Sequence, residues 1–268
     1  MEKIKSSTSK LPGIVYSRYA DVTYAGENFI EEHGLAYIIS GCISVPEGNK
    51  IDTFKKGDLI FYRKNYLAKF IKQPIEGESC KTITIVFDKE TLSDFSREHH
   101  YEYNKAYPLD EAVLCLEPNV LLLNFFKTLI PYFDVQVSDQ LIRLKKQEAL
   151  MLLLQEKPEL KDILFDFSHP GKIDLEAFMN QNFKFNVELK RLAYLTGRSL
   201  ATFKRDFEKI FNMSPNRWLQ QRRLQEAYYL IKEKSRKPSD VYIELGFQSI
   251  SHFSYAFKQF FGVNASSI

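Results

Sequence analysis

The sequence predicts an α+β protein in which an antiparallel β-domain with amphipathic helices is followed by an all-α domain. The first observation is a series of short segments at 14–90 that are rich in β-branched and aromatic residues and are separated by Gly, Pro, Asn and Asp. The second is a change of period near residue 110, after which apolar residues recur three and four apart. The third is an internal repeat with an offset of fifty residues in the last third of the chain.

The β-rich part contains four candidate strand regions: "IVYSRYADVTY", "LAYIISGCISV", "DTFKKGDLIFYRKN" and "CKTITIVFD". Short strands with turn residues between them favour an antiparallel barrel or sandwich. We expect the barrel to occupy about 14–95.

Two amphipathic helical segments follow, and we place them at about 110–165. They are "DEAVLCLEPNVLLLNFFKTLIPYF" and "SDQLIRLKKQEALMLLLQEKPEL". Ser138 is the expected N-cap of the second helix and Pro158 its end. Its expected apolar stripe includes Leu141, Leu144, Leu150 and Leu154. Pro170 and Gly171 mark a boundary, which predicts domains at 1–168 and 172–268.

The composition is that of an ordinary globular protein, with 44% hydrophobic and 26% charged residues. The opening "MEKIKSSTSK" lacks the apolar run of a secretory signal, and no segment approaches the ~20 apolar residues of a membrane span. Cys42, Cys80 and Cys115 lie far apart, as buried thiols in a reducing compartment do. We therefore expect a cytoplasmic protein that does not bind membranes.

The charge is unevenly distributed along the chain. Residues 172–268 contain 16 Lys and Arg against 9 Asp and Glu, a formal charge of +7, whereas residues 1–171 carry −4. A basic terminal third predicts a polyanionic partner for that third. The alternative is a chance excess of cations on solvated helices.

The repeat aligns "LTGRSLATFKRDFEKIFN" at 195–212 with "LGFQSISHFSYAFKQFFG" at 245–262. The identical pairs are Leu195 and Leu245, Ser199 and Ser249, Phe203 and Phe253, Phe207 and Phe257, and Phe211 and Phe261. In each copy a short helix is followed by a turn with a glycine, Gly197 or Gly246, and then by a serine that can cap the next helix. This order of signals is typical of a helix-turn-helix motif.

Helical spacing predicts an apolar and a polar face for the second helix of each copy. The expected inward residues are Phe203, Phe207, Ile210 and Phe211 in the first copy, and Phe253, Ala256, Phe257, Phe260 and Phe261 in the second. The expected outward residues are Ala201, Thr202, Lys204 and Arg205, and Ser251, His252 and Tyr255. A plain helical bundle with a polar surface is the alternative interpretation.

A predicted helix at 214–233 connects the copies, with Ser214 as its cap and Pro215 at its first position. About 19 helical residues span roughly 28 Å. Major grooves on one face of B-DNA repeat at about 34–36 Å. A connector of this length is consistent with two helices that enter adjacent grooves.

These residues resemble the AraC/XylS family of bacterial transcription regulators over about 185–266. The second copy carries the family's "GF" at 246–247, Ser251, Phe253, Phe257, Lys258 and "FFG" at 260–262. The first half carries "LA" at 192–193, Ser199, Phe203, Phe207, "SP" at 214–215 and "RRL" at 222–224. Departures are Tyr242 in place of a small alanine, Asn212 in place of glycine, and Asn264-Ala265 in place of Ser-Pro.

The resemblance implies a double helix-turn-helix domain whose two recognition helices enter the major groove of double-stranded DNA. It implies base contacts near Ala201, Thr202, Lys204 and Arg205, and near Ile250, Ser251, His252 and Tyr255. We expect phosphate contacts from Arg191, Ser199, Arg222, Arg223, Ser249 and Lys258.

For residues 1–168 the resemblance implies a cupin-like β-barrel that regulates the DNA-binding domain. His33 has no histidine partner near "GDLIFYRKN", so we expect no metal, no cofactor and no enzymatic activity. We expect a transcription activator, controlled by a small effector or a protein partner, that forms a homodimer and contacts RNA polymerase. The alternatives are a cupin-fold enzyme and a protein-interaction module, each with a basic helical appendage.

Overall fold

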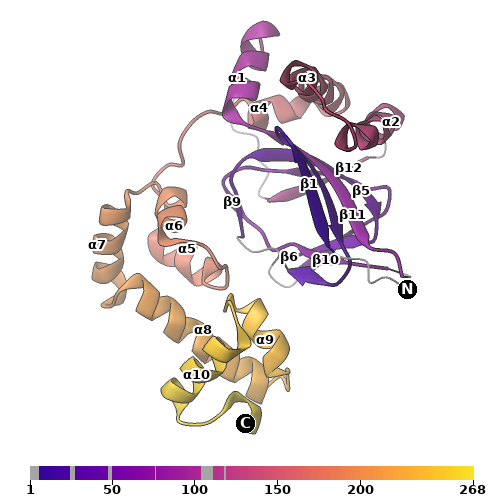
Figure 1. Cartoon of the computed structure of the whole chain (residues 1–268). Coiled ribbons are helices and arrows are strands. Elements are labelled where there is room, and N and C mark those ends of the chain that lie inside the picture. The colour runs from indigo at the N-terminus through magenta and orange to yellow at the C-terminus, as the bar shows by residue number, and fades with distance from the viewer. Residues whose placement is uncertain (1–5, 25–27, 48–49, 76, 104–110, 118) are drawn as a thin grey trace. The chain divides into compact units, whose positions relative to one another are not determined.

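The computed structural model describes residues 6–24, 28–47, 50–75, 77–103, 111–117 and 119–268 (Figure 1). The chain forms two compact units. The first comprises residues 1–25 and 30–168, and the second comprises residues 26–29 and 169–268. The first unit combines β-sheets with helices and the second is helical, so the predicted α+β class is confirmed.

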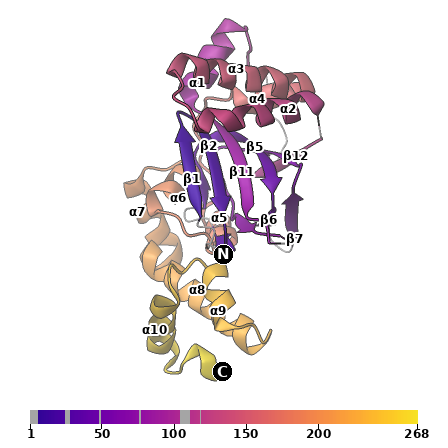
Figure 2. The same ribbon diagram turned by 45° about the vertical axis from the view of Figure 1, so that its right-hand side comes forward.

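Two antiparallel sheets account for most of the strands of the first unit (Figure 2). The larger has six strands in the order β1-β2-β11-β5-β8-β12, and the smaller has four in the order β3-β10-β6-β7. β4 and β9 form a two-stranded sheet. The strands are β1 (Ser7–Leu11), β2 (Ile14–Tyr19), β3 (Thr23–Tyr24), β4 (Phe29–Ile30), β5 (His33–Ser40), β6 (Cys42–Glu47), β7 (Lys50–Lys55), β8 (Leu59–Tyr62), β9 (Tyr66–Leu67), β10 (Ile71–Gln73), β11 (Cys80–Phe87) and β12 (Val113–Leu116).

The central strands of the larger sheet are buried on both faces. On β5, Leu35 belongs to the hydrophobic cluster that the helices share, whereas Ala36 and Ile38 belong to a second cluster with residues of the smaller sheet. On β8, Phe61 belongs to the first cluster and Ile60 to the second. Because successive side chains of a strand point to opposite faces, these strands contribute to two cores at once. This explains their almost continuous apolar sequences.

Four helices occur in the described part of the first unit, and Figure 2 shows them together beside the larger sheet. They are α1 (Lys89–Glu98), α2 (Val120–Leu129), α3 (Asp139–Glu156) and α4 (Lys161–Leu164), with short 3-10 turns at Ile130–Phe133 and Pro158–Leu160. Ser138 caps α3 as predicted, because its side chain accepts the Leu141 N–H.

Two expectations about element type were wrong. Lys89–Glu98 is a helix within the range expected to be barrel, and Asp88 caps it by accepting the Thr91 N–H at 2.8 Å. Val113–Leu116 is a strand that pairs with β8, within the range expected to be helical. The apolar segment 113–116 forms backbone hydrogen bonds with β8 at the edge of the larger sheet. Four apolar residues are too few for their spacing to distinguish a strand from a helix. Residue 110, the start of the predicted helical range, lies outside the described residues.

The apolar stripe predicted for α3 is divided between two faces. Leu150 and Leu154 lie in the core, whereas Leu141 is 38% exposed and Leu144 is 54% exposed. The core face is instead completed by Ile142, Ala149 and Leu153. The predicted stripe therefore combined residues from a buried face and an exposed face of α3.

His33 is buried, and its Nδ1 accepts the Lys64 N–H at 3.2 Å. Burial lowers the pKa of His33 to about 3. Across the described residues no group of three or more His, Cys, Asp or Glu side chains could hold a metal ion, and no helix is long and apolar enough to cross a membrane.

Candidate nucleic-acid interface

The second unit contains the repeat, and its helices follow the predicted order (Figure 1). The helices are α5 (Leu175–Asn182), α6 (Leu189–Leu195), α7 (Leu200–Phe211), α8 (Pro215–Lys232), α9 (Pro238–Glu244) and α10 (Ile250–Phe261), with a short 3-10 turn at Ala265–Ser267. α6 and α7 form one helix-turn-helix motif and α9 and α10 the other. Figures 1 and 2 show α8 running between the two motifs.

The turns of the two motifs use the same backbone conformation. Gly197 has φ +65° and Gly246 has φ +77°, a region that L residues rarely adopt. The ends of the recognition helices also match, with Asn212 at φ +53° and Gly262 at φ +77°. Asparagine, which tolerates this conformation, is thus accommodated where the second copy has glycine.

The starts of the recognition helices are equivalent as well. The Ser199 hydroxyl accepts the Thr202 N–H at 3.2 Å, and the Ser249 hydroxyl accepts the His252 N–H at 3.2 Å. Each serine is therefore an N-cap that fixes the first turn of its helix, which confirms the predicted caps.

Each recognition helix carries a row of phenylalanines, spaced four residues apart, on its inward face; we call this row its ladder. The fully buried members are Phe203, Phe207, Phe253 and Phe257. The ring centroids of the first pair lie 5.7 Å apart and those of the second pair 5.6 Å apart. Such aromatic pairs add to the stabilisation that burial itself provides.

Helix α8 contributes one aromatic residue to each ladder. The Trp218 ring lies 4.6 Å from the Phe211 ring, and the Tyr228 ring lies 4.8 Å from the Phe261 ring. With 18 residues, α8 is roughly 27 Å long. It therefore spaces the two motifs while it packs against both of them.

Two residues that were expected to face inward do not. Ile210 and Phe260, which are equivalent in the repeat, are each 40% exposed. The inward stripe of each helix consists of three phenylalanines spaced four residues apart. Ile210 and Phe260 each come one residue before the last of these phenylalanines, so they lie at the edge of the stripe.

The residues predicted to contact bases lie on the accessible side of α7 and α10. On α7, Ala201, Lys204 and Arg205 are exposed and Thr202 is half-buried. On α10, Ser251 and His252 are exposed, Ile250 is 40% exposed and Tyr255 is 68% exposed. The structure thus gathers each predicted set on one helix, within reach of a macromolecular partner.

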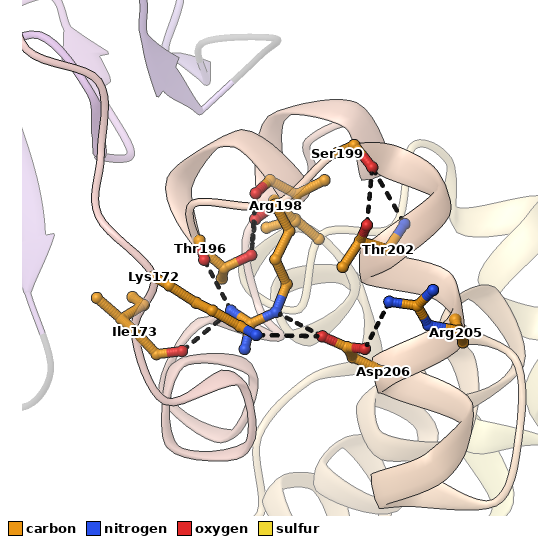
Figure 3. A network of polar contacts seen from close by, with 10 residues as sticks. Lys172, Ile173, Thr196, Arg198, Ser199, Thr202, Arg205 and Asp206 are labelled. Atoms are coloured by element: carbon orange, nitrogen blue, oxygen red, sulfur yellow. Dashed lines mark hydrogen bonds and ion pairs between the residues drawn. The ribbon is translucent and has the colours of Figure 1, made fainter.

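An ionic network that the sequence analysis missed restrains Arg205 (Figure 3). One Asp206 oxygen lies 3.6 Å from Arg205, and the other lies 3.2 Å from the Arg198 Nε and 4.0 Å from the Lys172 Nζ. The hydrogen bond from Arg198 holds the pKa of Asp206 below its usual value. Asp206 is therefore a carboxylate at neutral pH that can limit the motion of the Arg205 side chain.

Arg198 in turn fixes Asp206 to the fold. Its side chain is 8% exposed, and it donates to the Thr196 carbonyl at 2.7 Å and to the Ile173 carbonyl at 3.0 Å (Figure 3). The sequence signal for this role is a cation directly before the Ser199 cap, which the sequence analysis did not single out.

The predicted phosphate contacts fall into two groups. Lys258 is exposed in the last turn of α10, and the hydroxyls of Ser199 and Ser249 cap exposed helix starts. Arg191 and Arg222 are half-buried, with their guanidinium groups 4.8 Å from the ring centroids of Phe29 and Phe183.

Arg223 does not fit the phosphate role expected of it. It donates to the carbonyls of Phe183 at 2.7 Å, Phe185 at 2.9 Å and Gly246 at 3.3 Å. Burial lowers its pKa to about 10. Its donors thus join the segment before α6 to the turn before α10, and the neighbouring Arg222 could not be told apart from it by sequence.

Two family models match the chain. A model described as "Helix-turn-helix domain" matches residues 192–268, and one described as "ExsA N-terminal regulatory domain" matches residues 33–163.

Similar proteins extend over most of the chain. The "HTH-type transcriptional regulator ExsA" of Pseudomonas aeruginosa is 24% identical over 88% of this chain and 85% of its own length. The "Virulence regulon transcriptional activator VirF" of Yersinia enterocolitica is 24% identical over 88% of each chain. Among solved structures, unsaturated fatty acid bound wild-type ToxT from Vibrio cholerae aligns with a TM-score of 0.43 and 14% identity, over 100% of this chain and 96% of that one.

Proposed function

Because the chain belongs to the AraC/XylS family of DNA-binding transcription regulators, we propose that α7 and α10 enter adjacent major grooves of one operator. The observation that carries the proposal is the repeated geometry of the two motifs, from the capping serines to the left-handed C-caps. A spacer of roughly 27 Å between two rigid helices suits grooves that recur at about 34–36 Å. Residues 172–268 are the proposed DNA-binding domain and residues 1–168 the regulatory domain.

On this proposal, exposed side chains of α7 and α10 contact bases, and other groups of the domain contact phosphates. Arg205 and Lys204 can donate to O6 and N7 of guanine, and Ala201 and Thr202 lie one turn earlier on the same helix. On α10, Ile250, Ser251, His252 and Tyr255 form the corresponding set. Lys258, Arg191, Arg222 and the N-terminal turns capped by Ser199 and Ser249 can hold phosphates.

The substitution Arg205→Ala tests base reading by α7. We expect it to weaken binding to a selected operator by about 1–3 kcal/mol, roughly 5- to 150-fold, and to leave binding to random duplexes nearly unchanged. The operator is obtained by selection from random fragments, and affinity is measured by fluorescence anisotropy at fixed salt concentration. Lys209→Ala is the matched control, since Lys209 is an exposed cation on the same helix. Equal weakening on operator and random DNA would show that Arg205 contacts phosphate only.

Regulation through the first unit is the second part of the proposal. The match of residues 33–163 to a regulatory domain supports control by a small effector or a protein partner. The activator named among the relatives supports contact with RNA polymerase at a promoter. On this proposal the chain regulates transcription and does not catalyse a reaction.

Homodimerisation is the third part, and the exposed apolar face of α3 supports it. Leu144 is 54% exposed and Met151 is 49% exposed, on the same side of the helix as Leu141. Exposed apolar residues that share one side of a helix are candidates for an interaction surface.

We expect the double substitution Leu144→Glu with Met151→Glu to convert a dimer of the full-length protein to monomer. Sedimentation velocity at about 20 µM measures the change, because a weak dimer dissociates by mass action at lower concentration. Gln155→Glu, at an exposed position on the same helix, is the control and should remain dimeric. A wild-type monomer at this concentration would refute the proposal.

A further inference from the structure

We propose that the two recognition helices read DNA by different chemistry, and that α10 reads the 5-methyl groups of thymine through Ile250 and Tyr255. This inference rests on the proposed DNA-binding function and names the base composition that the second motif selects. The operator half bound by α10 is then rich in A·T pairs, whereas the half bound by α7 contains guanine at the position of Arg205.

The repeat allows a residue-by-residue comparison of the two helices. Their N-caps, their C-cap conformations and the spacing of their buried rings agree. Exposure agrees too, since the first residues of the helices, Leu200 and Ile250, are each 40% exposed. Residues whose numbers differ by fifty therefore occupy equivalent positions on α7 and α10, and would face a bound DNA groove in the same way.

Equivalent positions carry cations on α7 and uncharged groups on α10. Tyr255 stands where α7 has Arg205, and Ser254 stands where α7 has Lys204. No Lys or Arg occurs on α10 before Lys258. The Lys and Arg donors proposed to recognise guanine O6 and N7 in the first motif therefore have no counterpart on α10 before Lys258.

The outward face of α10 carries an aromatic ring where α7 carries the Arg205 guanidinium, whereas Ile250 has an equally exposed apolar counterpart in Leu200 of α7. Tyr255 is 68% exposed and Ile250 is 40% exposed. Isoleucine has no hydrogen-bonding group, so its side chain can distinguish base pairs in the major groove only through apolar contact. The one apolar group that a base presents there is the thymine methyl. The tyrosine ring offers a second surface for such contact, since its exposed area is larger still.

The residues next to the two helices differ in the same sense. On α7, Asp206 lies 3.6 Å from Arg205 and is itself held by Arg198 at 3.2 Å. Fifty residues later these two positions are Ala256, which is buried, and Gln248, which is exposed. A carboxylate thus lies beside the exposed cation of α7, whereas α10 carries no carboxylate.

Modified operators test the inference with the full-length protein. A selected operator is synthesised with deoxyuridine in place of thymine in one half at a time, and separately with 7-deazaguanine in place of guanine. Uracil lacks only the methyl group, and removing one methyl group that α10 touches should weaken binding about four-fold. We expect uracil to weaken binding more from the α10 half than from the α7 half, and 7-deazaguanine to weaken it more from the α7 half than from the α10 half.

Variants assign each half-site to its helix. Tyr255→Ala and Ile250→Ala should each reduce the difference between thymine and uracil operators, whereas Tyr255→Phe, which keeps the ring, should retain it. The inference is overturned if uracil has no effect in either half, if 7-deazaguanine weakens both halves equally, or if both alanine variants keep the full thymine preference. If selection yields no preferred sequence, the proposed function itself fails, so the two failures are distinguishable.

Discussion

Replacing Phe257 by alanine is expected to lower the free energy of unfolding of the helical unit by about 3–5 kcal/mol. Phe257 is fully buried, and its ring lies 5.6 Å from Phe253, 4.7 Å from Phe261 and 6.4 Å from Tyr228. Truncation removes the middle ring of the ladder on α10 and its contact with Tyr228 of α8. The cavity cannot close without moving one of these helices, and close-packed interiors resist such movement.

The single tryptophan of the chain makes this measurable in the intact protein. Trp218 lies in α8, 5.6 Å from Phe207 of the first motif, so its fluorescence reports on the helical unit. We expect the urea midpoint followed by Trp218 to fall in the Phe257→Ala variant, with an unchanged slope.

Phe260→Ala is the matched control for this substitution. It has the same chemistry on the same helix, but Phe260 is 40% exposed. The expected cost is below about 1 kcal/mol. If the Trp218 transition does not move in Phe257→Ala while helical circular dichroism is partly lost, the two motifs unfold separately and α8 does not couple them.

Replacing Gly246 by alanine is expected to destabilise the same unit by about 2–5 kcal/mol, combining a left-handed backbone with an overlap. Gly246 has φ +77°, and an added Cβ would lie 2.7 Å from the Lys184 carbonyl oxygen. The segment around Lys184 cannot easily retreat, because Arg223 binds the carbonyls of Phe183 and Phe185 as well as that of Gly246.

Gly262→Ala separates the two causes. Gly262 also has φ +77°, but nothing lies within 4 Å of its added Cβ. We expect a cost of about 1–2 kcal/mol there, from the backbone alone. Urea unfolding followed by Trp218 compares the two variants, and equal destabilisation would show that the overlap with residue 184 is relieved at little cost.

The sequence predicted most of the helical unit because its signals are local. The glycine turns, the serine caps and the phenylalanine spacing each act within about one or two helical turns, and the chain repeats them. Asn212 adopts the left-handed C-cap conformation that Gly262 adopts at the equivalent position of the second copy. The predicted secondary structure was wrong at Lys89–Glu98 and Val113–Leu116. Both segments are short, and the spacing of their apolar residues is compatible with either a helix or a strand.

Side-chain roles were harder to predict where a cation has distant partners. Arg222 and Arg223 are adjacent, yet Arg222 lies over the Phe183 ring while Arg223 donates to backbone carbonyls up to 40 residues away. Arg198 and Asp206 form their ion pair across a turn, and only the packed structure brings Lys172 to the same carboxylate.

The sequence alone determined the repeated motif, its caps and the outward residues of its recognition helices, since backbone preferences and helical period act over a few residues. The tertiary structure decided which cations are available, because burial and long-range carbonyl contacts draw Arg223 and Arg198 inward and leave Arg205 and Lys204 at the surface. It also decided that Leu141 and Leu144 face outward while Leu150 and Leu154 do not. A helix presents several apolar stripes, and only its packing against neighbours selects the one that is buried.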